Sequence, residues 1–354
     1  MGAGILGLGN PLLDVQVLAD AEFLRKFGLK PNDAILASAR PREVMVSLFE
    51  EVASRPDVEF VAGGSAQNSM RAAQWCLQGH SEICCSFVGS VGADETAEKM
   101  RKCCEEAKVR PVYQTIAAVE TGKCAVLISN KERSLVAWLG AAEQFDCEFL
   151  VSRKSELTQT HGIFYNEGFF VTVSPQAIDC LAEMAAISGG IYATNISAEF
   201  VATVPTFLDV FVKNVKHADY VFGNATEFRA LARGLALKET TDLKTVAKTV
   251  AAMKKIGNVQ RPRTVVITQG HEPTIVAVAG EDEVFEVPVV EVSPELIVDV
   301  NGAGDAYVGG FLAGLCQKKN LVDCCRMGAE CAAVVIQRSG CTFPANHAAS
   351  NLQF

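Results

Sequence analysis

The sequence of 354 residues has few of the features that mark nucleic-acid-binding or membrane proteins. Lys and Arg never run for more than two residues, and 32 of them stand against 41 Asp and Glu, for a net charge of −9. Wrapping a nucleic acid requires a basic face that displaces counterions, so nucleic acid is not expected as a partner. No apolar run approaches the roughly 18 residues of a membrane helix, and no basic leader opens the chain, so no membrane anchor is expected.

Cysteine is plentiful, but its spacing follows no metal or disulfide pattern. The 13 cysteines are odd in number and never form C-x-x-C. Two of the three adjacent pairs, Cys84-Cys85 and Cys103-Cys104, lie in segments that resemble a buried strand and an amphipathic helix, where reduced Cys behaves as a small hydrophobic residue. We therefore expect free thiols and a reducing, cytoplasmic location.

Several nucleotide-binding and hydrolytic motifs are also missing. The pair Gly122-Lys123 is followed by Cys124, so there is no Walker P-loop, and the opening glycines do not complete a dinucleotide-binding fingerprint. H-E-x-x-H does not occur, and the five His are scattered. A nucleotide, if bound, must be held in another way.

From about residue 160, short apolar segments alternate with helical patterns of ten or more residues. The pattern predicts strands at 162–165, 190–195, 220–222 and 263–268 and helices at 175–187, 204–215, 226–233 and 242–256. Such alternation implies βαβ units and a mostly parallel sheet with helices on both faces, so the predicted fold class is α/β. Ligands of such sheets collect beyond the carboxyl ends of the strands.

Two strand-rich stretches, 16–62 and 112–139, fall outside this alternation. We interpret them as insertions that pair into one small β-rich lid. The predicted large domain then comprises residues 1–15, 63–111 and 140–354.

The strongest chemical signal is the stretch 298–311, VDVNGAGDAYVGGF. Gly302 and Gly304 free the backbone to turn tightly, so successive N–H groups at the start of the next helix point into one concavity that favours an anion. Asp305 in the first helical turn then lies within reach of a hydroxyl that attacks a phosphoryl group. Taken alone, G-A-G-D would equally suit an ordinary turn and an ordinary first-turn acid.

This stretch resembles the C-terminal signature of the ribokinase-like (PfkB) family of sugar and nucleoside kinases, with Val300 where Thr is usual. The resemblance extends in chain order through further motifs: GNPLLD at 9–14, AGGSAQNS at 62–69, TGKCA at 121–125, RSL at 133–135, GFF at 168–170, GNATE at 223–227, TQG at 268–270 and SGCTFP at 339–344. It therefore covers nearly the whole chain.

The resemblance implies a large α/β domain with a smaller lid, and phosphorylation of the 5′-hydroxyl of adenosine by ATP with Mg²⁺. It makes Asp305 the general base, with Gly302, Ala303 and Gly304 as the anion hole and Arg133 as a lid residue that closes onto the phosphates. Without the resemblance, a surface salt bridge is an equally good reading of Arg133. The expected protein is a monomer with adenosine and ATP as its small-molecule partners.

The resemblance also assigns a nucleoside site and a nucleotide site. Asp14 and Asn68 are expected to grip the vicinal diol, although Asn and Asp are common turn residues, and Ser65 to contact the purine edge. The remaining nucleoside residues are Asn10, Gly63, Gly64, Leu135, Ala137, Leu139, Phe169 or Phe170, and Asn301, although apolar residues at strand spacing are often simply core. The nucleotide is assigned to Asn224, Thr268, Gly270, Gly302 and Gly304, and Mg²⁺ to Glu227 through water.

Two other readings stay open at this point. In the first, the chain is another ribokinase-like sugar or nucleoside kinase. In the second, it is a nucleoside-binding protein of the same fold that catalyses no reaction. The intact Gly302-Ala303-Gly304-Asp305 motif argues against the second.

Overall fold

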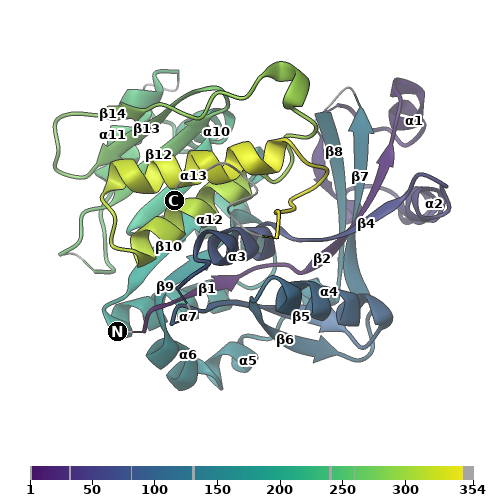
Figure 1. Cartoon of the computed structure of the whole chain (residues 1–354), viewed down its shortest axis with the longest axis horizontal. Helices are drawn as coiled ribbons and strands as arrows, with labels where there is room; N and C mark the ends of the chain where they lie inside the picture. Colours follow the sequence, from purple (N-terminus) through teal and green to yellow (C-terminus); the bar gives the residue numbers. More distant parts are fainter. Residues whose placement is uncertain are drawn as a thin grey trace.

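Two β-sheets of unequal size and the helices around them make up the computed structural model, which describes residues 2–31, 33–80, 82–129, 132–238, 241–258 and 260–345 (Figure 1). Across the large sheet the strands are ordered β14 (Phe285–Val287), β13 (Glu272–Val278), β12 (Thr264–Gln269), β11 (Tyr220–Asn224), β10 (Ile191–Asn195), β9 (His161–Asn166), β1 (Gly4–Leu8), β5 (Cys85–Gly92) and β6 (Arg110–Ile116). Neighbours from β12 to β6 pair in parallel, and only the hairpin strands β13 and β14 are antiparallel. The predicted α/β class is confirmed.

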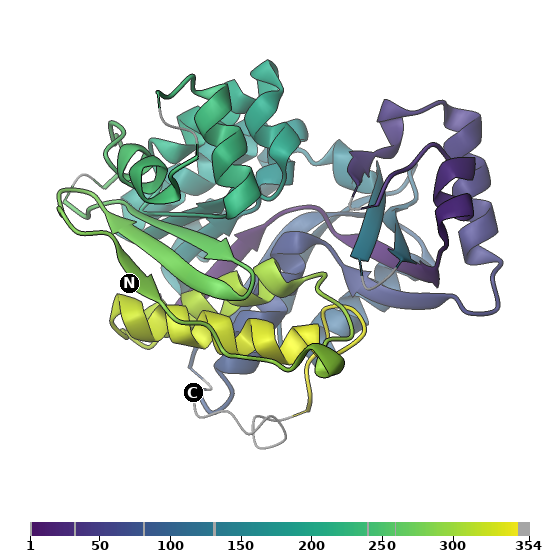
Figure 2. The same ribbon diagram turned by 90° about the horizontal axis from the view of Figure 1, so that it is seen from above.

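Helices cover both faces of the large sheet, as Figure 2 shows from above. One face carries α3 (Ser65–Cys76), α4 (Glu95–Glu106), α12 (Ala303–Cys316) and α13 (Leu321–Ile336). The other carries α5 (Cys147–Val151), α6 (Lys154–Thr160), α7 (Pro175–Ser188), α8 (Glu199–Thr203), α9 (Pro205–Val215), α10 (Ala225–Gly234) and α11 (Leu243–Ala251). Successive strand residues point to opposite faces, so Ile5 packs in the first core and Leu6 in the second.

Local sequence signals explain why several helix bounds match the prediction. Helix α7 begins after Ser174, whose side chain accepts the N–H of Ala177, and Pro175 occupies the first turn. It ends at Gly189, which has φ +66°. A Ser cap, an N-terminal Pro and a left-handed terminal Gly are the usual helix boundaries, and all three can be found in sequence.

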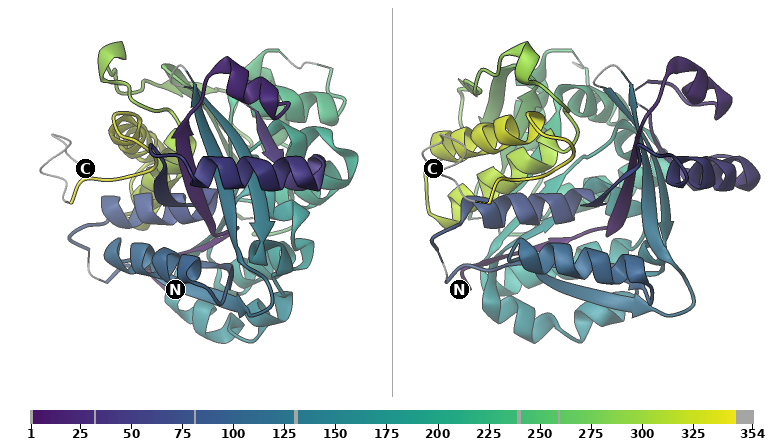
Figure 3. Two further views of the ribbon diagram at one scale, coloured as in Figure 1. Left: turned by 90° about the vertical axis from the view of Figure 1, so that its right-hand side faces the viewer. Right: turned by 45° about the vertical axis from the view of Figure 1, so that its right-hand side comes forward.

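The small sheet packs its helices on one side only. Its strands are ordered β3 (Ala34–Leu36), β8 (Glu132–Gly140), β7 (Thr121–Ser129), β2 (Leu12–Leu18) and β4 (Glu59–Gly63). Helices α1 (Ala21–Lys26) and α2 (Arg42–Ala53) lie on its outer face (Figure 3), where Val136 of β8 contributes to their core. The neighbours Leu135 and Ala137 point to the inner face, toward the large domain.

Four short 3₁₀ helices complete the described secondary structure: η1 (Ala37–Ala39), η2 (Ala141–Gln144), η3 (Gly168–Thr172) and η4 (Pro294–Leu296). The sheet assignments shift the expected lid boundaries. Strand β6 pairs with β5 in the large sheet, whereas β2 enters the small sheet already at Leu12. Apolar alternation looks the same in both sheets, so only the pairing partner decides which sheet a strand joins.

In the described part of the chain no helix combines the length and hydropathy that a membrane crossing would require. All 13 cysteines lie there as free thiols. Cys84 is exposed, contrary to the expectation of a buried strand, because β5 begins only at Cys85. The described residues also contain no group of three or more His, Cys, Asp or Glu placed to hold a metal ion.

Candidate active site

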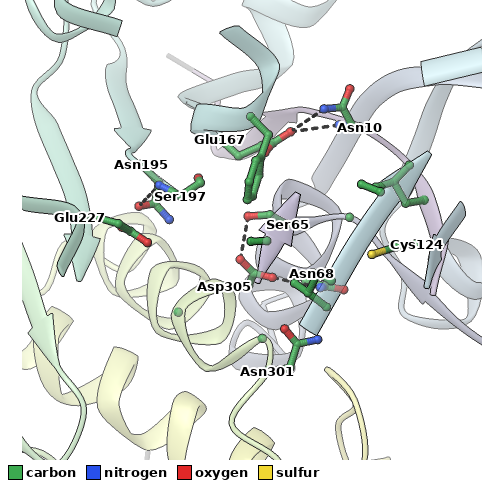
Figure 4. A pocket seen from close by; sticks show the side chains of 18 of the residues that line it. Asn10, Ser65, Asn68, Cys124, Glu167, Asn195, Ser197, Glu227, Asn301 and Asp305 are labelled. Atoms are coloured by element: carbon green, nitrogen blue, oxygen red, sulfur yellow. Dashed lines mark hydrogen bonds between the residues drawn. The ribbon is translucent and has the colours of Figure 1, made fainter. Parts of the chain in front are cut away.

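A pocket of about 320 Å³ lies between the inner face of the small sheet and the carboxyl ends of the large-sheet strands (Figure 4). This volume falls within the range of small-molecule sites. Residues from both sheets, from α3 and from the start of α12 line it. Residues as far apart in the sequence as Asn10 and Val308 therefore meet here.

Gly302 begins α12 in a conformation that favours glycine. It has φ +75°, and a Cβ there would lie 2.8 Å from the Cβ of Cys341. Gly302 and Gly304 line the pocket, and the first N–H groups of a helix have no acceptor within the helix. The N–H of Ala303 instead donates to the carbonyl oxygen of Val300 at 3.3 Å, and Ala303 is absent from the described lining. Within the described residues the N–H groups of Gly302 and Gly304 have no backbone acceptor outside the helix, so the helix start offers donors to an anion.

Asp305 lies in the first turn of α12 and is held by two residues of α3. The Ser65 hydroxyl donates to Oδ1 at 2.7 Å, and the Asn68 amide nitrogen donates to Oδ2 at 3.0 Å. Burial raises the pKa of Asp305 to about 6, against the lowering effect of these two hydrogen bonds. A carboxylate with such a pKa is ionised at neutral pH and is a stronger base than an ordinary Asp.

Ser65 and Asn68 therefore contact the predicted base, and both also line the pocket. They are three residues apart on α3, so they share one helix face. The turn before them needs two glycines. Gly64 has φ +94°, and a Cβ on Gly63 would lie 2.4 Å from the Asp14 carboxyl group. Gly63 packs against the Asp14 carboxyl group and is not among the described residues that line the pocket.

Asp14 and Glu167 add two further acids to the same pocket. Burial raises the pKa of Asp14 to about 7, with nearby Arg133 lowering it and Asp305 raising it. The pKa of Glu167 is raised to about 8, again chiefly by burial. The sequence prediction did not include Glu167, although a polar residue directly after a buried strand end, here β9, was the available signal.

An apolar slot adjoins these acids. Leu135, Ala137 and Leu139 alternate along β8 and all face the pocket. Phe169 lines it as well, with its ring centroid 5.9 Å from that of Phe200. Phe170 does not: it is fully buried and packs against Phe145. Of the two Phe residues, the structure brings only Phe169 to the slot, since η3 turns the next side chain into the core.

The nucleotide residues predicted from G-N-A-T-E form a capping box at the start of α10. The Asn224 side chain accepts the N–H of Glu227, and the Glu227 carboxylate accepts from the backbone and amide nitrogens of Asn224. Both residues and Thr268 line the pocket. Gly270, with φ +66°, forms the turn between β12 and β13 outside the described lining.

The predicted phosphate role of Arg133 meets a specific obstacle. Its guanidinium is buried, donates to both carboxylate oxygens of Asp299 and to Gln16, and does not line the pocket. Asp299 also accepts the N–H groups of Asn301 and Gly340 at 2.9 and 2.8 Å. Arg133 reaches a phosphate only if this ion pair opens.

The sequence prediction did not name the remaining lining residues: Leu12, Ala34, Ile35, Leu36, Cys124, Thr172, Asn195, Ser197, Phe200, Phe222, Gly223, Val300, Tyr307 and Val308. Six of them lie inside the motifs quoted above, namely Leu12, Cys124, Gly223, Val300, Tyr307 and Val308, and the others belong to none of these motifs. Asn301 lines the pocket as predicted from its motif.

Comparison with known proteins places this site in a family. The model of the pfkB family of carbohydrate kinases matches residues 21–348, so the chain belongs to this family, as the motifs predicted. Relatives that match over nearly the whole length are adenosine kinases. Adenosine kinase 1 of Arabidopsis thaliana is 40% identical over 341 residues, 96% of either chain, and the Saccharomyces cerevisiae enzyme is 37% identical over 97% of this chain and 98% of its own.

Solved adenosine kinase structures have the same fold. That from Anopheles gambiae, in complex with P1,P4-di(adenosine-5) tetraphosphate, superposes with a TM-score of 0.88 at 40% identity over 96% of this chain and 97% of that one. That from Schistosoma mansoni, in complex with 2-fluoroadenosine, gives 0.89 at 27% identity over 97% and 98%. The ribokinase-like architecture predicted from the sequence is thereby confirmed.

Proposed function

We propose that this protein is an adenosine kinase, which transfers the γ-phosphoryl group of ATP to the 5′-hydroxyl of adenosine and releases AMP and ADP. Its relatives over the full length are adenosine kinases. The observation that carries the proposal is Asp305, held by Ser65 and Asn68 beside the free N–H groups of Gly302 and Gly304. A base and an anion site thus adjoin one pocket.

In the proposed reaction, the Asp305 carboxylate takes the proton of the 5′-hydroxyl while the hydroxyl oxygen attacks the γ-phosphorus. The new bond joins that oxygen to phosphorus, and the bond from phosphorus to the bridging oxygen of ADP breaks. The N–H groups of Gly302 and Gly304 donate hydrogen bonds to the phosphoryl oxygens and stabilise the negative charge that these oxygens carry during transfer. Arg133 contributes only after leaving Asp299.

Glu227 is the residue that we assign to Mg²⁺. It lines the pocket beside Asn224, and burial raises its pKa to about 7. Both its oxygens accept hydrogen bonds from Asn224, which leaves lone pairs free for metal-bound water. This fits a cation held mainly by phosphates and water, which needs only one or two protein carboxylates. When bound, Mg²⁺ neutralises phosphate charge.

Removing this carboxylate should change the metal requirement. We expect the Glu227→Gln variant to need several times more Mg²⁺ for half-maximal activity, because a neutral amide attracts metal-bound water less strongly. A magnesium titration of the kinase rate on wild type and variant measures this. Identical titration curves would remove Glu227 from the metal site.

The apolar slot favours a nucleoside over a free sugar. A sugar presents hydroxyl groups on every side, whereas Leu135, Ala137, Leu139 and Phe169 offer it no partner. Burying a base there removes apolar surface from water. The alternative that the protein is a sugar kinase of the same family therefore gives no role to these apolar residues.

Release of ADP, measured with adenosine, inosine, ribose or no acceptor, tests the proposal. We expect release to depend on adenosine and the product to be AMP by mass spectrometry. Ribose as the preferred acceptor would make the protein a sugar kinase, and binding of adenosine without ADP release would make it a nucleoside-binding protein.

We further propose that the protein acts as a monomer in the cytoplasm, with adenosine and ATP as its partners and neither nucleic acid nor membrane among them. The net charge of −9 and the 13 free thiols support this proposal. Sedimentation of the purified protein measures the oligomeric state.

A further inference from the structure

Glu167 is a buried acid of the pocket that the proposed reaction does not use. It follows strand β9 directly and is 1% exposed. Figure 4 shows its carboxyl group turned toward Asn10 at one end of the pocket, while Asp305 and Asn68 lie further along. A buried acid without a cationic partner is costly, so its presence calls for a reason.

The carboxyl group of Glu167 joins two separate walls of the site. Its Oε1 accepts from the backbone N–H of Asn10 at 3.2 Å and from the Asn10 amide nitrogen at 3.4 Å. On the other side, Glu167 directly precedes η3, and its backbone carbonyl accepts the N–H of Phe170 at 3.3 Å. Its packing is close, because a Cβ on Gly9 would lie 2.9 Å from Oε1.

These two walls belong to different parts of the fold. Asn10 lies in the short connection between β1 of the large sheet and β2 of the small sheet. Phe169 lies in η3 and contributes the aromatic side of the apolar slot. The separation between them sets the shape of the end of the pocket that receives the base.

We propose that Glu167 is a positioning residue for the nucleoside: by holding Asn10 and the Phe169 turn together, it fixes the two walls of the site and thereby sets the affinity for adenosine. It touches none of the reacting atoms. The inference rests on the proposed function, because it takes adenosine as the ligand. Its loss should therefore raise KM and leave kcat nearly unchanged.

The charged groups around Glu167 determine whether its carboxyl group is protonated. Asp305 on α12 faces it and raises its pKa, and Tyr165 on β9 is a further titratable group that it influences. Asp14 on β2 and Glu227 on α10 line the same pocket, and no Lys, Arg or His is among its described lining residues. With a pKa raised to about 8, Glu167 is uncharged at pH 7.

An uncharged carboxyl group still serves this role. Its carbonyl oxygen, Oε1, accepts both N–H groups of Asn10, and the proton then resides on Oε2. Among the described residues, Glu167 Oε2 and Asn10 Oδ1 are both buried without a hydrogen-bond partner. Such orphaned oxygens point to a ligand or a bound water at this end of the pocket.

The test compares Glu167→Ala and Glu167→Gln with wild type in steady-state kinetics with adenosine between pH 6.5 and 9.5. We expect Glu167→Ala to raise KM about tenfold at pH 7 with kcat within about threefold, since two hydrogen bonds to Asn10 are lost. Glu167→Gln keeps an oxygen acceptor without a charge, so its KM should stay within about twofold of wild type. Glu156→Gln, at an exposed acid of α6, is the matched control.

The pH profile separates positioning from a merely structural role. Wild-type KM should rise above pH 8 as Glu167 ionises beside Asp305, whereas KM of Glu167→Gln should stay flat. An unchanged KM in Glu167→Ala, a Gln variant as poor as the Ala variant, or identical profiles for wild type and Gln would each overturn the inference. If Glu167→Ala does not fold, as seen by circular dichroism, the Gln profile decides alone. Wild type without adenosine-dependent activity would instead refute the proposed function.

Discussion

Buried acids in two regions of this molecule have different surroundings. In the pocket, Asp14, Glu167, Glu227 and Asp305 all have raised pKa values, and no cationic side chain is among the described lining residues. At the far end of the parallel strands, Asp219 is 1% exposed and pairs with both Lys255 and Arg261.

The difference reflects what each group does. Asp219 also accepts the N–H of Tyr192, so both its oxygens are engaged and it links β10 and β11 to Lys255 and Arg261. The pocket acids keep capacity for a ligand, and hydrogen bonds and distant charges compensate only part of the cost of their burial. A folded protein accepts such a cost at a functional site when the rest of the structure supplies the stability.

The largest effect should follow from removing the base. We expect Asp305→Asn to lower kcat by about 10²- to 10⁴-fold, the usual range for a general base, with KM little changed. Steady-state ADP release measures both values. Asp323, a half-buried acid in the first turn of neighbouring α13 that does not line the pocket, is the matched control, and Asp323→Asn should keep the wild-type rate. A near-normal kcat in Asp305→Asn would exclude Asp305 from the chemistry.

Removing Asp219, the acid paired with Lys255 and Arg261, should affect stability and leave catalysis intact. We expect Asp219→Ala to lower the free energy of unfolding by about 3 to 5 kcal/mol, because two partly buried cations lose their partner, while kcat of the folded enzyme persists. Urea unfolding followed by circular dichroism measures the loss. Asp323→Ala removes a solvent-exposed pair with Arg326 and a hydrogen bond from the Asn320 amide, and it should cost about 1 kcal/mol. An equal loss of unfolding free energy in Asp219→Ala and Asp323→Ala would contradict a stabilising role specific to Asp219.

Substrate hydroxyls should matter next. Within the described residues the Asp14 carboxyl group has no hydrogen-bond partner, so we assign it to the ribose diol. An unpaired buried group costs about 1 to 3 kcal/mol, so 2′-deoxyadenosine should fall roughly 5- to 150-fold in kcat/KM. Asp14→Ala should narrow this gap. Kinetics with both nucleosides on both proteins test it, and equal use of the two by wild type would refute the diol assignment.

The smallest effect should be a pH dependence on the acid side. Because the pKa of Asp305 is raised to about 6, the base is ionised above that pH and protonated below it. We expect kcat to fall about tenfold for each pH unit below 6, while an ordinary Asp would hold the rate constant down to about pH 4. Measuring kcat from pH 4.5 to 8 shows where this fall in rate begins. A midpoint near 4 would mean that adenosine and ATP restore an ordinary environment to Asp305.

Much of the site could be found from motifs, because its backbone geometry demands glycine. The tight turns at Gly64 and Gly302 have positive φ, so they appear in the sequence as glycine motifs. The polar residues beside these glycines line the pocket. The roles of individual side chains were less accessible. Ser65 and Asn68 face Asp305, which lies 240 and 237 residues further along the chain.

The sequence by itself determined the α/β class, the alternating elements after residue 160 and the family, since apolar periodicity, helix caps and glycine turns are local properties. Only the tertiary structure decided which of Phe169 and Phe170 reaches the slot, which sheet β6 joins, and that Glu167 and Asp299 face Asn10 and Arg133. These depend on pairings across long stretches of chain and on burial, which raises a pKa only after the walls of a pocket have closed around the acid.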